Sequence, residues 1–149
     1  MRAVVQRVKY AKVSVDEKII GQIDKGIMLL LGIEENDEVK DLDYMCDKTI
    51  NLRIFEDEDG KMNKSLIDVE GSILVISQFT LYGDARKGRR PSFITAADPS
   101  KAIPLYEKFI EKIKESGIKT EVGEFGADMQ VELLNDGPVT ILLDSKKTF

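Results

Sequence analysis

Two short polar segments, each next to a strongly apolar run, hold the residue types that could carry chemistry in this chain. The first, residues 77–84, reads SQFTLYGD and follows the apolar residues 73–76. The second, residues 135–140, reads NDGPVT and precedes the apolar residues 141–143. Polar residues at the end of a buried strand lie at the edge of a site, not at the centre of a core. The chain has no histidine, so any site must work with hydroxyls, amides and backbone groups.

In the first segment, Ser77 or Thr80 would need a base to act as a nucleophile, and no histidine is present to serve as one. One interpretation is structural, since hydroxyls at a strand end bond the local backbone. The functional interpretation needs no strong base. Backbone N–H groups around Gln78, Phe79 and Thr80 can form an oxyanion hole for a reactive ester, while Thr80 positions the attacking water. One such donor contributes roughly 3–4 kcal/mol, which suits a labile ester and not an amide.

The Gly137-Pro138 pair in the second segment has two interpretations. Its residue types favour a turn between two strands. Base rates favour a trans peptide bond, since only about 5–6% of X-Pro bonds in folded proteins are cis. Alternatively, the pair leaves backbone carbonyls bare for a ligand, because proline has no N–H and glycine permits a close approach. On spacing alone the turn is favoured.

Composition excludes several kinds of site. The 149 residues, 42% hydrophobic and 33% charged, suit one folded domain. Without histidine and with the single Cys46, catalytic triads, Cys-His dyads and the usual zinc sites are ruled out. We expect Cys46 to be a small buried side chain on a helix. A carboxylate-only metal site in the acidic run EDEDG, residues 56–60, is formally possible, but the run lacks EF-hand spacing and is more typical of an Asp-Gly turn.

Charge and hydropathy bear on partners and location. A net charge of −5 is not typical of a nonspecific nucleic-acid binder. A basic cluster nevertheless follows the first segment, and it consists of Arg86, Lys87, Arg89 and Arg90. Such runs are usually solvated loops, yet beside a candidate site they are a plausible phosphate contact. No apolar run approaches the roughly 20 residues of a membrane helix, and the N-terminus lacks a signal-peptide pattern, so we expect a cytoplasmic protein.

Periodicity predicts the elements that must position the two segments. An antiparallel meander is expected over residues 4–15, 19–23 and 27–31. One helix is expected after a cap at Asn36 or Asp37, and a second between Asp98-Pro99-Ser100 and Ser116-Gly117. Further strands are expected at residues 53–55, 71–76, 119–122, 129–134 and 139–143. Because most connections are too short for parallel crossovers, the pattern predicts one strand-rich α/β domain over residues 1–149 with two main helices and a mostly antiparallel sheet.

The chain closely resembles the D-aminoacyl-tRNA deacylases along nearly its whole length. The motifs that carry the resemblance are QRV at 6–8, LLGI at 30–33, LRIF at 52–55, GKMN at 60–63, SQFTL at 77–81, RPSF at 90–93, ADMQV at 127–131 and NDGPVT at 135–140. So many motifs in one order make the match specific. The resemblance implies a barrel-like sheet, no cofactor, no metal, no membrane association, and a cytoplasmic homodimer that acts on the acceptor end of D-aminoacyl-tRNA.

The resemblance also implies roles for both segments. The family hydrolyses the ester that joins a D-amino acid to the terminal ribose of tRNA. By resemblance, Gly137-Pro138 is cis and enters the partner's active site, where its carbonyls capture the substrate amino group and an L side chain would clash. Glycine has no side chain to clash, so glycyl-tRNA mischarged on tRNA(Ala) should be accepted. The catalytic segment corresponds to Ser77, Gln78, Phe79 and Thr80.

Two mechanisms and three classes of function stay open at this point. Thr80 could be the nucleophile, or the terminal ribose hydroxyl of the substrate could assist, and the absence of histidine favours the ribose. Besides an esterase for mischarged tRNA, the chain could be an RNA-binding or dimerisation module without turnover, which the missing general base supports. A metal-dependent hydrolase that uses the acidic run is the weakest alternative.

Overall fold

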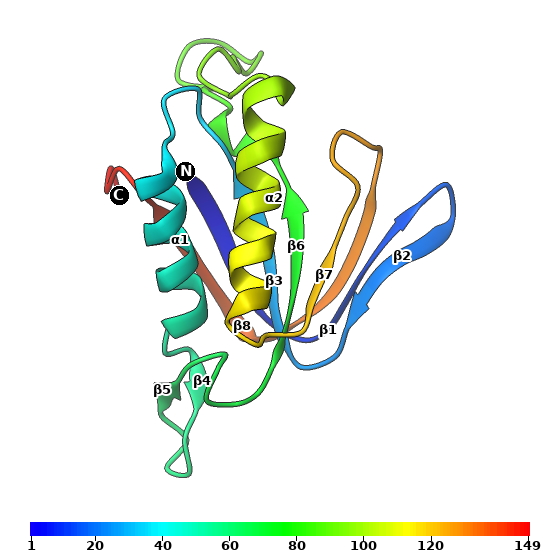
Figure 1. Cartoon of the computed structure of the whole chain (residues 1–149), viewed down its shortest axis with the longest axis vertical. Helices are drawn as coiled ribbons and strands as arrows, with labels where there is room; N and C mark the ends of the chain where they lie inside the picture. Colours follow the sequence, from blue (N-terminus) through cyan, green and yellow to red (C-terminus); the bar gives the residue numbers. More distant parts are fainter.

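A computed structural model describes residues 1–149, and it shows a strongly curved sheet with two helices packed on one face (Figure 1). In chain order the elements are β1 (Arg2–Val15), β2 (Lys18–Ile23), β3 (Gly26–Gly32), α1 (Val39–Asn51), β4 (Phe55–Glu56), β5 (Met62–Lys64), β6 (Ser72–Ser77), the 3₁₀ helix η1 (Phe79–Tyr82), α2 (Pro99–Glu115), β7 (Thr120–Val122) and β8 (Gln130–Asp144). The predicted α/β architecture with two main helices is confirmed. Neither helix has the length and apolar character needed to cross a membrane.

The main sheet has the strand order β2-β1-β3-β6-β7, and β8 pairs with β1. The three pairings of β1, with β2, β3 and β8, are antiparallel, whereas β3–β6 and β6–β7 are parallel. The two parallel pairs are those whose connections contain α1 and α2, long enough for crossovers. Gly21 of β2 lies against the Val122 carbonyl of β7, so the sheet nearly closes on itself. The sheet is therefore mixed and barrel-like, with antiparallel pairing throughout its β1 half.

Local sequence signals account for most element ends. Asp16 and Glu17 have φ values of 48° and 65° and form the tight turn between β1 and β2, as two-residue hairpins require. For α2 the cap Asp98, the following proline and Gly117 at φ 83° bear out the predicted bounds. For α1 the predicted cap is wrong. The cap is Glu38, which shares a reciprocal capping box with Asp41.

The core is divided between the two faces of the sheet. One cluster of 20 buried residues fills the space between the sheet and both helices, and it includes Phe109 and Cys46. A second cluster of seven buried residues lies on the other face, inside the curve of the sheet. Burial raises the pKa of the Cys46 thiol to about 12. Cys46 is therefore a protonated core side chain, as expected from its position on an apolar helix face.

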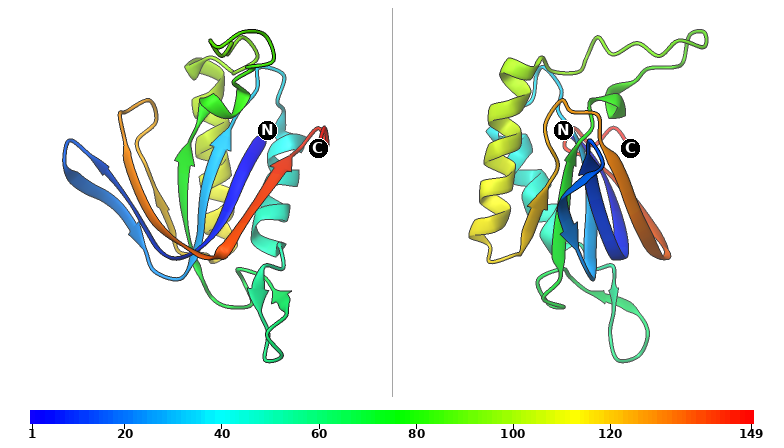
Figure 2. Two further views of the ribbon diagram at one scale, coloured as in Figure 1. Left: turned by 180° about the vertical axis from the view of Figure 1, so that it is seen from behind. Right: turned by 90° about the vertical axis from the view of Figure 1, so that its right-hand side faces the viewer.

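The second polar segment does not form the predicted turn between two strands. β8 is one strand that runs from Gln130 to Asp144, and its pairing with β1 is irregular around residues 135–140. The Asn135 side chain closes this bend: its Oδ1 accepts from the Val139 N–H at 2.7 Å and its Nδ2 donates to the Val139 carbonyl at 3.2 Å. The Gly137-Pro138 bond is cis, which confirms the cis bond implied by the resemblance and shows that the base-rate expectation of a trans bond is wrong. The bend lies at the lower end of the sheet (Figure 2).

Candidate functional site

The first polar segment sits where β6 leaves the sheet and η1 begins. Ser77 is the last residue of β6 and pairs with Leu31 of β3. The Gln78 N–H donates to the Leu31 carbonyl at 2.8 Å, which fixes the point of exit from the sheet. η1 then begins at Phe79. The leading N–H groups of a helix have no acceptor within it, so those of Phe79 and Thr80 are available to a ligand.

A cavity of about 250 Å³ adjoins this strand end. Its lining is mostly apolar and comes from the end of β6, the start of η1, the segment between β7 and β8, and the start of β8. The lining residues are Ile76, Ser77, Gln78, Phe79, Phe125, Gly126, Ala127, Met129 and Val131. An apolar cavity with a few convergent polar groups is typical of a small-ligand site. From the sequence, residues 127–131 stand out only as a resemblance motif and residues 129–134 as a strand, and none of residues 125–131 was predicted to line the site. The signal that could have identified them is the glycine-bearing run GEFGAD at residues 123–128.

Thr80 follows Phe79 but does not itself line the cavity, and its side chain is exposed. Its Oγ1 accepts a hydrogen bond from the Gln78 side-chain amide. The Gly83 N–H donates to the Thr80 carbonyl at 2.9 Å and so closes the turn. An amide donor cannot take a proton from the hydroxyl. The arrangement therefore supplies hydrogen-bond donors for a developing oxyanion, but no base that would activate Thr80.

A buried arginine, Arg7, donates a hydrogen bond to the backbone of the Gly137-Pro138 bend. Arg7, 6% exposed, donates from Nε to the Asp136 carbonyl at 2.8 Å and from one terminal nitrogen to the Ile54 carbonyl at 2.7 Å. Two directed bonds from one rigid guanidinium fix the backbone immediately before Gly137. In the sequence, Arg7 stands out only as part of the QRV motif. The available signal was a charged residue in an inward-facing strand series with Ala3 and Val5.

The structure does not bring the two polar segments together within one chain. Arg7, beside the bend, pairs with Ile27, which pairs with Ile73 of β6, four residues before Ser77. The bend and Ser77 are thus about 13 Å apart along the strand direction. Across the strands they are about 14 Å apart, which is the three spacings from β8 through β1 and β3 to β6. In Figure 2 the bend of β8 lies at one end of the sheet and the tip of β6 at the other. Gly137 and Pro138 are exposed at their end.

The four basic residues lie on the loop that follows η1, and they differ in their contacts. Arg86 makes a two-pronged ion pair with Asp84, from Nε at 2.9 Å and from a terminal nitrogen at 2.7 Å. This hydrogen bonding lowers the pKa of the Asp84 carboxyl to about 2. The remaining three cations, Lys87, Arg89 and Arg90, are exposed. Arg86 therefore shapes the loop, while the side chains of the other three are open to solvent.

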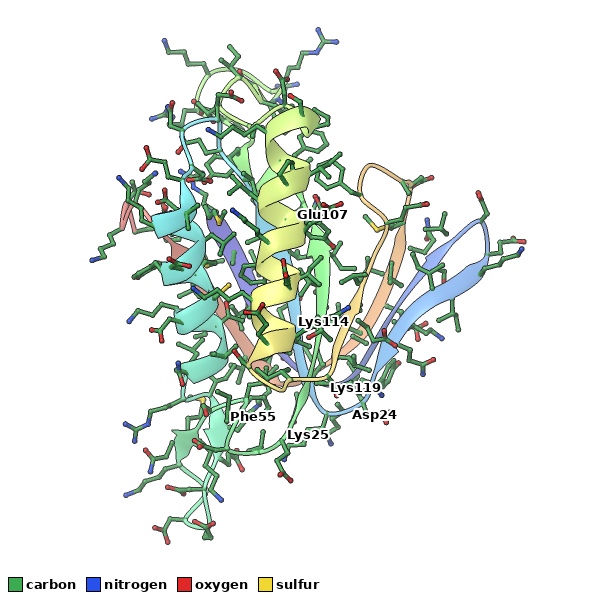
Figure 3. All side chains as sticks on the ribbon, viewed as in Figure 1. Asp24, Lys25, Phe55, Glu107, Lys114 and Lys119 are labelled. Atoms are coloured by element: carbon green, nitrogen blue, oxygen red, sulfur yellow. The ribbon has the colours of Figure 1, made fainter.

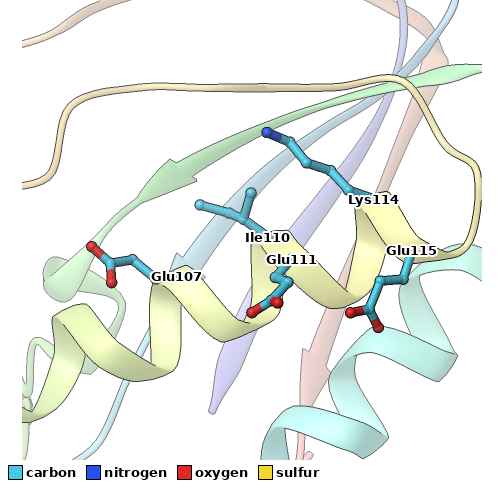
Figure 4. A pocket seen from close by; sticks show the side chains of 5 residues that line it. All are labelled: Glu107, Ile110, Glu111, Lys114 and Glu115. Atoms are coloured by element: carbon cyan, nitrogen blue, oxygen red, sulfur yellow. The ribbon is translucent and has the colours of Figure 1, made fainter.

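A larger hollow, of about 600 Å³, lies along the outer face of α2, away from both polar segments. Figures 3 and 4 show its charged side chains spread along the helix surface, and its lining residues are Glu107, Ile110, Glu111, Lys114 and Glu115. It holds none of the residues that the sequence singles out. No group of three or more His, Cys, Asp or Glu side chains in the structure is placed to hold a metal ion.

Comparison with known proteins agrees with this arrangement. A family model described as D-Tyr-tRNA(Tyr) deacylase matches residues 4–144. Proteins named D-aminoacyl-tRNA deacylase from Fervidobacterium nodosum and Clostridioides difficile are each 62% identical over 149 residues, with all of both chains covered. The solved structure of a c-Myc DNA unwinding element binding protein matches with a TM-score of 0.91 and 44% identity, over 97% of this chain and 98% of that one.

A probable eukaryotic D-amino acid tRNA deacylase shares the fold, with a TM-score of 0.84 and 16% identity over 95% of this chain and 97% of that one. The full-length match to the family and the high identity to its bacterial members agree with the fold and with both motifs. The chain belongs to the D-aminoacyl-tRNA deacylase family, whose members are hydrolases.

Proposed function

We propose that the protein hydrolyses the ester bond of D-aminoacyl-tRNA, with water as co-substrate, and releases free D-amino acid and tRNA. The observation that carries this proposal is the cavity beside Ser77, Gln78 and Phe79, which has unengaged backbone N–H groups at its edge and no base. Such a site stabilises charge and positions groups, and this is sufficient for an intrinsically labile ester. Membership of the deacylase family identifies the ester.

In this mechanism the ester carbonyl oxygen faces the N–H groups of Phe79 and Thr80. As water attacks, these donors stabilise the negative charge on the oxygen. The proton that water loses passes to solvent or to the neighbouring ribose hydroxyl of the substrate, because the chain places no base there. The bond to the terminal ribose then breaks. Thr80 positions groups and does not form a covalent intermediate.

A second copy of the chain completes the site. Gly137-Pro138 is exposed and far from its own Ser77, so it is free to reach into a neighbouring molecule. Leu142, Val4 and Leu30 are cross-strand neighbours on the sheet face opposite the helices and form an apolar row there. Leu142 is 57% exposed, and Val4 and Leu30 are partly buried. An exposed apolar row beside the bend suits an interface between two copies.

Chirality is read at the inserted bend. The carbonyls of Asp136 and Val139 already accept hydrogen bonds from Arg7 and Asn135, so the carbonyls of Gly137 and Pro138 themselves accept from the substrate α-ammonium group, since proline offers no competing N–H. In that orientation an L side chain points into the backbone wall, whereas a D side chain points away from it. Glycyl-tRNA, including glycine mischarged on tRNA(Ala), has no side chain to clash and is hydrolysed as well. These substrates place the enzyme in the cytoplasm.

The experiment that tests this function compares amino acid release from D-tyrosyl-tRNA and L-tyrosyl-tRNA in the presence of a chelator. We expect rapid release from the D-substrate only. Release from neither substrate would contradict the function, and loss of activity with chelator would point to a metal.

The variant Gly137→Ala tests the bend, because a Cβ there lies 2.7 Å from the Val139 side chain and projects from the exposed segment. We expect at least a tenfold loss of D-substrate hydrolysis with a folded circular-dichroism spectrum. Gly60→Ala is the matched control, since Gly60 also has positive φ but is remote and surrounded by open space. Unchanged hydrolysis by Gly137→Ala would count against the proposed wall.

A second candidate function is aminoacyl-tRNA binding without turnover. It is favoured by the missing base at Thr80 and by a similar solved structure that is named as a DNA-element binding protein. It predicts tight binding of a non-hydrolysable D-aminoacyl-tRNA analogue together with no release from the ester, which the same assay detects.

A further inference from the structure

An aromatic pair with exposed faces extends from the candidate site onto the basic loop. The rings of Phe79 and Phe93 meet edge to face, with centroids 5.2 Å apart and an interplanar angle of 68°. Phe79 is 56% exposed and Phe93 37% exposed, and the next residue, Ile94, is 90% exposed. Phe79 also lines the cavity. An apolar surface that is continuous with the cavity therefore leads out along the loop.

The fold holds this surface in place. The Phe93 ring packs on Gly83 so closely that a Cβ at Gly83 would lie 3.0 Å from Cε1. Just before Phe93, Asp84 and Ser92 exchange two backbone hydrogen bonds of 2.8 and 2.9 Å, which close the loop at its base. The ion pair of Arg86 with Asp84 braces the same base. These contacts fix the position of Phe93 at the base of the loop.

The loop tip carries positive charge with no acidic partner. Lys87, Arg89 and Arg90 are exposed and make no ion pair, although the whole chain has a net charge of −5. The apolar row headed by Leu142, which we propose as the interface between copies, contains none of these three cations. Exposed aromatic faces beside unpaired cations match a single-stranded nucleic acid, whose bases stack on rings and whose phosphates need countercharges. Charge complementarity therefore favours RNA at this loop.

We propose that the Phe79–Phe93 pair and the loop tip bind the single-stranded nucleotides that precede the terminal adenosine of the tRNA acceptor end. A base stacks on the exposed Phe93 face, and Lys87, Arg89 and Arg90 contact the adjoining phosphates. This rests on the proposed function, because it is the ester in the cavity that directs the RNA strand past Phe79. Residues 84–92 thereby contribute to affinity for tRNA without taking part in the chemistry.

The first test compares two substrates, D-tyrosyl-tRNA and the D-tyrosyl ester of adenosine, which lacks the preceding nucleotides. For Phe93→Ala we expect kcat/KM on the tRNA to fall about 5- to 150-fold, the range for losing one stacked base. Hydrolysis of the adenosine ester should change less than about twofold. Ile20→Ala, which also trims an exposed apolar side chain but on β2, should change neither.

The second test does not disturb the aromatic pair. The triple variant Lys87→Gln, Arg89→Gln, Arg90→Gln should weaken tRNA hydrolysis and flatten its dependence on salt, by up to about 2 in the log–log slope. The control removes the same charge from three exposed lysines on α2 and just after it, Lys108, Lys114 and Lys119, of which Figure 3 labels the last two. The control should leave the slope unchanged.

The outcomes are separable. If the native enzyme hydrolyses neither ester, the proposed function fails. If it hydrolyses both and neither the Phe93 nor the triple variant affects the tRNA selectively, the RNA-binding surface is wrong while the function stands. If Phe93→Ala lowers both activities and the protein sediments as a smaller particle, the aromatic pair belongs to an interface between copies, and the assignment to RNA is overturned.

Discussion

At the scale of single residues, the surroundings of Thr80 decide between the two mechanisms. Its hydroxyl receives a hydrogen bond from the Gln78 amide and meets no group that could accept its proton. An unactivated hydroxyl is a weak nucleophile. A role in positioning the substrate or water therefore agrees better with the contacts than a covalent role does.

We expect Thr80→Ala to lower kcat for D-tyrosyl-tRNA by less than about tenfold, because only positioning is lost. Removing a true nucleophile costs several orders of magnitude. Single-turnover release of D-tyrosine measures the effect, with Thr80→Ser as the control that keeps the hydroxyl. A loss of 1,000-fold or more in the alanine variant alone would establish Thr80 as the nucleophile.

A second residue with a testable role is Asp41, whose carboxylate links the first turn of α1 to the C-terminal segment. Burial by itself raises its pKa, but hydrogen bonds from Lys146, the Glu38 N–H and Ser145, at 2.8–2.9 Å, outweigh burial and lower the pKa from 3.8 to about 2. A depressed pKa means that the carboxylate stabilises the fold in full above about pH 4 and that this stabilisation is lost as pH falls toward 2.

We expect Asp41→Asn to lower the free energy of unfolding by about 2 kcal/mol at pH 7. It should also remove part of the decrease in the free energy of unfolding that we expect for the native protein between pH 4 and pH 2. Urea unfolding at several pH values measures both effects. Asp24→Asn, at the exposed turn between β2 and β3 (Figure 3), is the control. If the free energy of unfolding of Asp41→Asn decreases just as steeply over this pH range, the Asp41 carboxylate is not the stabilising group.

At the scale of elements, β3 and β6 approach closely where both strands begin. Gly26 pairs with Ser72 in the parallel ladder, and a Cβ on Gly26 would lie 1.8 Å from the Ser72 carbonyl oxygen. Neither backbone segment can move away without shifting the β3–β6 pairing, which also positions Ser77 at the edge of the cavity. This contact places the end of β6 relative to β1 and the rest of the site.

We expect Gly26→Ala to destabilise the protein by about 3 kcal/mol or more, the upper range for overpacking. Gly60→Ala, where the added methyl meets open space but φ is 73°, should cost only about 1–2 kcal/mol. Urea midpoints of the two variants give the comparison. Equal midpoints would show that the strands separate easily at Gly26.

At the scale of the whole molecule, one chain contains only part of the proposed site. The cavity and the exposed Gly137-Pro138 bend lie at opposite ends of the sheet, and the apolar row of Val4, Leu30 and Leu142 covers the face between them. A second copy that packs on this row would bring each bend toward the other cavity. On this proposal, activity requires two copies of the chain.

We expect Leu142→Glu to convert a particle of twice the 16.7 kDa chain mass into a single chain and to lower D-tyrosyl-tRNA hydrolysis at least 100-fold. A charge in the middle of an apolar interface is costly to bury. Sedimentation velocity and the release assay on one sample test both effects. Ile20→Glu, on the exposed β2 hairpin, is the control. A fully active single chain would contradict the shared site.

The sequence alone determined the features that depend on neighbouring residues. Caps and periodicity located α2, the β1–β2 hairpin and the buried strand before Ser77, because these signals act within a few residues. Residue types identified both polar segments and excluded histidine chemistry. The motifs in order identified the family.

Tertiary structure decided the features that depend on pairing between distant segments. Asn135-Asp136-Gly137-Pro138 has the composition of a turn, yet it forms a bend within β8, because its neighbours on both sides pair with the single long strand β1. Arg7 and residues 125–131 gained their roles in the same way. The separation of the two polar segments follows from strand order and register, which no local pattern specifies. Register is set by how whole strands bury their faces against one another, so only the folded sheet shows that the two polar segments lie apart within one chain.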